Sequence, residues 1–234
     1  MRDDIFSFQF EDHIFKFYLP YATRDLVQRA IFETSTFFEE ELLKKIRQYI
    51  NPESVVVDAG ANIGNHSMFF SKICRAKTVQ SFEPLKPVFS MFETNLKLND
   101  ITNVVGHNVA LGESAGWATI NGYSHTNVGG TQFGMDERGS FKVITLDSLN
   151  LPRVDFCKVD VEGMQFEFLK GARKTLETCR PIIWIEMLNK ESALFKYNEE
   201  REVLMPQKIL KEIGYELHEK MSPVDYLYIH QSAH

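Results

Sequence analysis

The residues with the clearest chemical potential form a turn at positions 58–64, Asp-Ala-Gly-Ala-Asn-Ile-Gly, directly after a short β-branched run. Gly60 allows a tight turn and a close approach between the backbone and a ligand. The helix that we expect after Gly64 offers unpaired N–H groups to an anion. The GxxxG spacing differs from the GxGxxG of dinucleotide-binding turns, and this disfavours a nicotinamide oxidoreductase.

The acid at the head of this turn narrows the class of ligand. A carboxylate at Asp58 would repel a pyrophosphate, but it can order the turn or meet a cation. The combination suits a ligand that carries both an ammonium and a carboxylate, such as the methionine part of S-adenosylmethionine. A plain strand-to-helix turn is the alternative. If the turn binds this ligand, we expect the contacts from the following residues: Asp58, Gly60, Ala61, Asn62 and Gly64.

A second acid, Glu83, follows the next predicted strand, residues 78–82, and precedes Pro84. A carboxylate at a strand end can accept hydrogen bonds from both hydroxyls of a ribose. A solvent-facing acid before a proline is the alternative, but the first acid, at the end of the neighbouring strand, favours a ligand. Asn108, which ends the third predicted strand, is expected to border an adenine ring.

Further acids follow the fourth and fifth predicted strands, residues 155–160 and 181–186. Asp160 and Glu162 follow the former, and Glu186 ends the latter. Open α/β sheets bind ligands outside the carboxyl ends of their strands, so we expect these acids at the same edge as the turn. The alternative is that Asp160 or Glu162 caps the helix that follows.

The order of the predicted elements is typical of a doubly wound α/β fold. Strand-like and helical segments alternate from residue 54 to 186, and two further strands, 215–218 and 226–230, close the chain. This predicts a seven-stranded, mostly parallel sheet with helices on both faces and the last strand antiparallel. Residues 112–152 break the rhythm, and we expect an irregular loop with a hairpin there.

The first fifty residues precede this pattern. Alternation of aromatic and polar residues over 5–18 predicts a β-hairpin, and two helices are expected over 23–32 and 37–49. We expect residues 1–50 to belong to the same globule as residues 51–234. They would cover the carboxyl edge of the strands or an edge of the sheet.

The composition is globular, with 44% hydrophobic and 25% charged residues among 234. The net charge of −6 lacks the basic field of non-specific nucleic-acid binding, so no nucleic-acid partner is expected. Three cysteines without CxxC spacing suggest neither disulfides nor a zinc site. No apolar run reaches the ~18–20 residues of a membrane span, and the N-terminus shows no signal peptide. A cytoplasmic location is therefore expected.

Taken in order, the motifs resemble those of the FkbM-type methyltransferases. The matching stretches are 57–66, 82–84, 144–147, 158–163, 169–172 and 181–186. The resemblance implies a class I, S-adenosylmethionine-dependent methyltransferase on a Rossmann-like sheet. Such enzymes usually methylate a hydroxyl oxygen of a sugar, lipid or secondary metabolite, so the expected partner is a small-molecule or glycan acceptor. The family commonly has a second Glu where this chain has Gln165, which keeps the hydrogen bonding and drops the charge.

A hydroxyl acceptor must lose its proton to a base. We predict Glu162 as the acceptor-binding residue and base, with Glu186 in support and Asp160 nearer the cofactor. His125, in the 112–152 segment, is the second candidate for the base, although a loop histidine is more often solvated. The three acids suit Mg²⁺, but the resemblance does not require a metal and we predict none. A non-catalytic nucleoside-binding or scaffold protein on the same fold is the alternative function.

Overall fold

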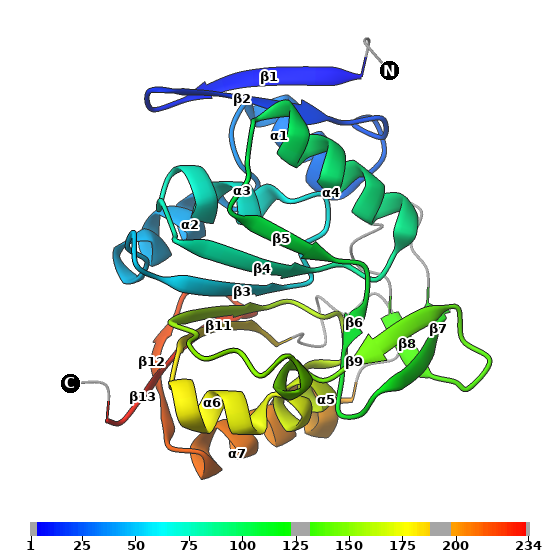
Figure 1. Ribbon diagram of the computed structural model, residues 1–234, viewed down its shortest axis with the longest axis vertical. Helices are drawn as coiled ribbons and strands as arrows, with labels where there is room; N and C mark the ends of the chain where they lie inside the picture. The colour runs from blue at the N-terminus through cyan, green and yellow to red at the C-terminus, as the bar shows by residue number, and fades with distance from the viewer. Residues whose placement is uncertain (1–3, 123–131, 188–197, 233–234) are drawn as a thin grey trace.

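The computed structural model describes residues 4–122, 132–187 and 198–232 (Figure 1). Its centre is a seven-stranded sheet with the strand order β12-β13-β11-β10-β3-β4-β5. The strands are β3 (Val55–Ala59), β4 (Thr78–Phe82), β5 (Val104–His107), β10 (Phe156–Val159), β11 (Ile182–Glu186), β12 (Tyr215–Lys220) and β13 (Asp225–His230). Strands β11, β10, β3, β4 and β5 pair in parallel, whereas β13 runs antiparallel to both β11 and β12. The predicted sheet is confirmed.

Helices cover both faces of this sheet (Figure 1). They are α3 (Asn65–Lys72), α4 (Lys86–Leu98), α5 (Gln165–Gly171), α6 (Arg173–Cys179) and α7 (Met205–Glu212), with short helical turns at η1 (Arg47–Tyr49), η2 (Leu146–Leu149) and η3 (Glu200–Leu204). Neighbouring residues of β3 point to opposite faces of the sheet. Val56 packs in the core that includes α3 and α4, and Val57 packs in the core that includes α5, α6 and α7. Central strands buried on both faces need such continuous apolar runs. In the described part of the chain, no helix is both long and apolar enough to cross a membrane.

The N-terminal elements are a hairpin of β1 (Ile5–Phe10) and β2 (His13–Tyr18), followed by α1 (Leu26–Thr34) and α2 (Glu40–Ile46). One face of the hairpin buries phenylalanines against Phe37 and Phe69, and the Phe15 and Phe37 rings lie 4.7 Å apart, edge to face. Asn95 of α4 accepts a hydrogen bond from the Tyr18 N–H at 2.6 Å. The hairpin therefore packs its aromatic face against α3 and α4, next to α1 (Figure 1).

A second, four-stranded sheet has the order β6-β9-β7-β8. Its strands are β6 (Ala110–Leu111), β7 (Gly116–Gly122), β8 (Gln132–Met135) and β9 (Phe141–Ile144). The expected irregular loop with a hairpin was thus too simple. Strands β7 and β9 pair antiparallel within the segment expected to hold a hairpin, but β6 and β8 were missed. The two residues of β6 owe their extended form to pairing with β9, about thirty positions away in the sequence.

Candidate functional site

The turn after β3 is shaped by glycines and presses against the end of β10. Gly60 and Gly64 have φ angles of +85° and +91°. The N–H groups of Gly60 and Ala61 both donate to the Phe82 carbonyl, at 3.0 and 2.9 Å, which ties the turn to the end of β4. A Cβ atom on Gly60 would lie 1.7 Å from the carbonyl oxygen of Asp160. Only glycine fits this position, because the backbone of residue 160 occupies the space that a side chain would need.

Asp58 orders the turn from beneath. It is fully buried and accepts a hydrogen bond from the Ser67 hydroxyl at 2.5 Å. The ammonium of Lys158, itself 2% exposed, lies 3.8 Å from Asp58 Oδ1 and 3.0 Å from Asp160 Oδ2. Burial lowers the pKa of Lys158, but the charges of Asp160 and Asp58 outweigh burial and hold this pKa above its usual value. Asp58 therefore orders the turn, and the cation it meets is a lysine of this chain; Asp58 is not among the residues that line the pocket described next.

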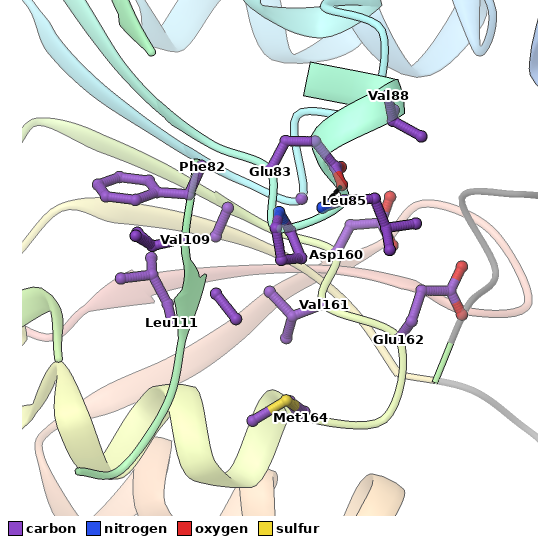
Figure 2. A pocket seen from close by; sticks show the side chains of 14 residues that line it. Phe82, Glu83, Leu85, Val88, Val109, Leu111, Asp160, Val161, Glu162 and Met164 are labelled. Carbon is purple, nitrogen blue, oxygen red and sulfur yellow. Dashed lines mark hydrogen bonds between the residues drawn. The ribbon is translucent and has the colours of Figure 1, made fainter. Parts of the chain in front are cut away.

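Beyond the turn, a pocket opens at the carboxyl ends of β3, β4 and β10 (Figure 2). Glu83 lies on its wall, 6% exposed, and its carboxylate accepts hydrogen bonds from the N–H groups of Asn62 at 3.1 Å and Leu85 at 2.8 Å. Burial raises the pKa of Glu83 to about 7, although these two hydrogen bonds and Lys158 act in the opposite direction. The chain thus fixes the direction of this side chain before any ligand arrives.

Much of the pocket wall is apolar, and the sequence analysis missed it. Its larger apolar side chains, labelled in Figure 2, include Phe82, Leu85, Val88, Val109, Leu111 and Met164. Such a wall suits a flat aromatic ring. Asn108 serves it indirectly, because its amide donates to the carbonyls of Glu83 and Pro84 at 2.8 and 3.0 Å. Asn108 itself does not line the pocket, but the three residues that follow it, 109–111, do.

Three further carboxyl groups meet beside the pocket. Asp160, Glu162 and Glu186 each place an oxygen within 4.8 Å of the others. Burial, together with the charges of Asp160 and Glu162, raises the pKa of Glu186 well above its usual value. Burial also acts to raise the pKa of Asp160, but Lys158 and a hydrogen bond with Glu186 outweigh it and lower that pKa. Of these two carboxyl groups, Glu186 therefore binds a proton more readily than Asp160, with which it shares a hydrogen bond.

Glu162 follows on the turn between β10 and α5 and lines the pocket (Figure 2). Its φ angle of 46° is left-handed, and Gly163 continues the turn with a φ of 89°. Left-handed backbone is uncommon for a non-glycine residue, and such positions cluster at functional sites. The other predicted catalytic candidate, His125, lies outside the described residues.

A second cleft continues from the pocket. It shares Gly60, Glu83, Asp160 and Glu162 with the pocket and adds Asn62 and Glu186. Its remaining wall comes from the N-terminal elements: Leu26, Val27, Phe38 and Glu39. The sequence analysis expected the N-terminal segment near this edge but named none of these residues. The hairpin is remote from the site, whereas the start of α1 and the residues before α2 reach it.

We predict that the acid cluster works without a divalent metal. Three carboxylates would suit Mg²⁺, but the raised pKa of Glu186 lets a proton relieve part of their repulsion in place of a metal ion. Turnover measured with and without a strong chelator should therefore agree. Loss of activity with the chelator and its return with added Mg²⁺ would contradict this prediction.

Comparisons with known proteins agree with this geometry. Residues 58–217 match the family described as the methyltransferase FkbM domain. The chain is 27% identical over 145 residues to Methyltransferase 1 of Beauveria bassiana, covering 51% of this chain and 58% of that protein. It is 27% identical over 150 residues to the hexuronic acid methyltransferase AglP of Haloferax volcanii, covering 62% of this chain and 61% of that protein. The alignments thus span about three fifths of these relatives.

A solved structure shares the fold. The methyltransferase FkbM from Methylobacillus flagellatus superposes with a TM-score of 0.54 at 19% identity, covering 77% of this chain and 44% of that one. The family match extends over more than half of the chain and includes the glycine turn, Glu83, the three acids and the strands that carry them. This chain therefore belongs to the FkbM methyltransferase family.

Proposed function

We propose that this methyltransferase, whose methyl donor is S-adenosylmethionine, transfers the methyl group to a hydroxyl oxygen of a sugar, a lipid-linked glycan or a secondary metabolite. The observation that carries the proposal is the cleft that continues from the donor pocket and holds three carboxyl groups. A relative, AglP, is named a hexuronic acid methyltransferase, which supports an oxygen acceptor on a sugar.

The residues of the pocket fit the donor. We assign the methionyl and ribose region to the turn 60–64, the ribose hydroxyls to Glu83, and the adenine ring to the apolar wall. Gly60 lines both the pocket and the cleft, and Glu83 is already oriented by two backbone N–H groups. When bound, the donor supplies an electrophilic methyl group on a sulfonium.

The acids of the cleft divide the remaining work. Asp160 is paired with Lys158, and the pKa of Glu186 is raised by burial and by its acidic neighbours. Glu162 lines the pocket from the turn after β10, and this position favours it as the carboxylate that takes the proton of the acceptor hydroxyl. Glu186 keeps its neighbour Asp160 hydrogen-bonded, and Lys158 holds Asp160 beside the turn.

The proposal is tested by following release of S-adenosylhomocysteine with pooled acceptors. The informative pair is a hexose and the matching uronic acid, because only the latter also offers a carboxylate, which needs no base. Methylation of hydroxyls in both members is expected. Transfer only to carboxylates, or only to nitrogen or carbon acceptors, would contradict the proposal.

Replacing Glu83 should weaken donor binding. Loss of a charge-assisted hydrogen bond costs about 1.5–3 kcal/mol, so Glu83→Ala should raise the dissociation constant of S-adenosylmethionine roughly 10- to 150-fold. Glu93→Ala, which removes an exposed acid of α4, is the control and should change nothing. Calorimetric titration measures both, and an unchanged affinity of Glu83→Ala would show the assignment to be wrong.

A further inference from the structure

We propose that the N-terminal elements complete the donor site, with Glu39 receiving the α-ammonium group of the methionine part of S-adenosylmethionine. The inference rests on the donor assigned above and adds a residue from a segment that lies outside the family match, which begins at residue 58. It predicts that the first fifty residues take part directly in cofactor binding.

The backbone before Glu39 is fixed to the helix that follows the glycine turn. The Phe38 N–H donates to Asn65 Oδ1 at 2.9 Å, and Asn65 Nδ2 donates back to the Phe38 carbonyl at 3.0 Å. Asn65 is 2% exposed and directly follows Gly64. This two-way hydrogen bond sets Glu39 against the donor turn, so the two segments keep one geometry although they are far apart in the sequence.

Glu39 itself has an unusual backbone. Its φ and ψ angles of 60° and 34° lie in the left-handed region, where glycine or asparagine would be less strained. A glutamate persists there because the paired Phe38 and the start of α2 on either side hold it. Strained positions of this kind cluster at ligand sites, and the Glu39 side chain, 27% exposed, lines the cleft.

A buried histidine lies beside Glu39. His66 is 5% exposed, and its ring meets Trp184 edge to face at 5.2 Å. Its Nε2 lies 3.0 Å from Glu39 Oε2, so the ring helps to fix the position of this carboxylate at the cleft. A carboxylate, which has only acceptors, is the complement of an ammonium group, which has only donors.

The charge of the cleft also favours a cationic ligand. The charged residues on its wall are all acidic: Glu39, Glu83, Asp160, Glu162 and Glu186. The basic residue beneath it, Lys158, is already engaged by Asp58 and Asp160. The adenosyl part is assigned to the apolar pocket on one side of Gly60, which leaves the methionine end for the cleft on the other side, where Glu39 lies.

The test compares two ligands by calorimetry. S-adenosylhomocysteine carries the amino-acid part, and 5′-deoxy-5′-methylthioadenosine lacks it. Glu39→Gln should weaken binding of the former roughly 10- to 150-fold, as expected for loss of a charge-assisted hydrogen bond, and leave the latter unchanged. Glu40→Gln is the matched control, because Glu40 is the next residue and pairs with Lys44 at 2.7 Å; it should alter neither affinity.

A second variant guards against a folding defect. Glu39→Asn keeps a residue that tolerates left-handed backbone and should show the same selective loss. An equal loss of affinity for both ligands would mean that Glu39 only supports the structure. Unchanged affinity for both would mean that Glu39 does not bind the ammonium group. Either result overturns the inference and leaves the proposed function intact. Failure of the unaltered protein to bind S-adenosylhomocysteine would instead overturn the donor assignment and this inference with it.

Discussion

Glu162→Gln should lower turnover by about 10²- to 10⁴-fold, the usual cost of losing a general base, and leave S-adenosylmethionine affinity nearly unchanged. The amide keeps the length and hydrogen-bonding capacity of the side chain but cannot take a proton. It also places no new demand on the left-handed backbone at this position, so the fold should persist. Steady-state turnover on the true acceptor and calorimetric titration of the donor measure the two quantities.

Glu177→Gln provides the control for this prediction. Glu177 lies on α6 and pairs with Arg173 at 3.0 Å, away from the cleft. Its replacement should leave turnover unchanged. If Glu162→Gln loses less than tenfold, the base is a different residue, and His125 is the next candidate.

Lys158→Met should lower the free energy of unfolding by about 3–5 kcal/mol, because it removes the cation that a buried pair requires. Asp58, which is fully buried, would lose its cationic neighbour, and Asp160 would lose the neighbour that lowers its pKa. Urea unfolding at neutral pH measures the loss. Lys77→Met is the control: Lys77 pairs with Glu53 at 3.2 Å on the surface, where a pair contributes about 0–1 kcal/mol.

The pH dependence of this loss follows from the lowered pKa of Asp160. In the unaltered protein, that carboxylate contributes stability above its usual pKa of 3.8, and the contribution disappears as the pH falls through the lowered value. In Lys158→Met the contribution is already absent, and protonation of the acids relieves their burial. The difference between the two proteins should therefore narrow on acidification. A loss below about 1 kcal/mol, or one independent of pH, would contradict the assignment.

The sequence predicted the parts of the molecule that depend on local patterns. Two features could be recognised from a few neighbouring residues each. They are the β-branched run of β3 with the turn at Gly60, and the acid at the end of β4. Alternating strands and helices then fix a parallel sheet, and a parallel sheet brings its strand ends to one edge. This is why Asp160 and Glu186, which are 26 positions apart in the sequence, were expected together and are found together.

The parts that escaped prediction depend on contacts between distant segments. Val88 and Met164 are ordinary apolar residues, and only the assembled sheet makes them one pocket wall. Glu39 is one of three consecutive acids, so its residue type does not distinguish it. The two hydrogen bonds between Phe38 and Asn65 bring it to the cleft. The strand β6 exists only as a partner of β9. No local propensity encodes these placements.

The contact between Gly60 and residue 160 joins two backbones, with no side chain of residue 160 involved. Glycine is therefore required at position 60 whichever side chain residue 160 carries. The Asp160 side chain has a separate connection to the turn, because Lys158 donates both to its carboxylate at 3.0 Å and to the Gly60 carbonyl at 3.4 Å. A descendant of this protein that exchanged the acid at 160 could keep glycine at 60, but it would have to find another partner for the buried lysine.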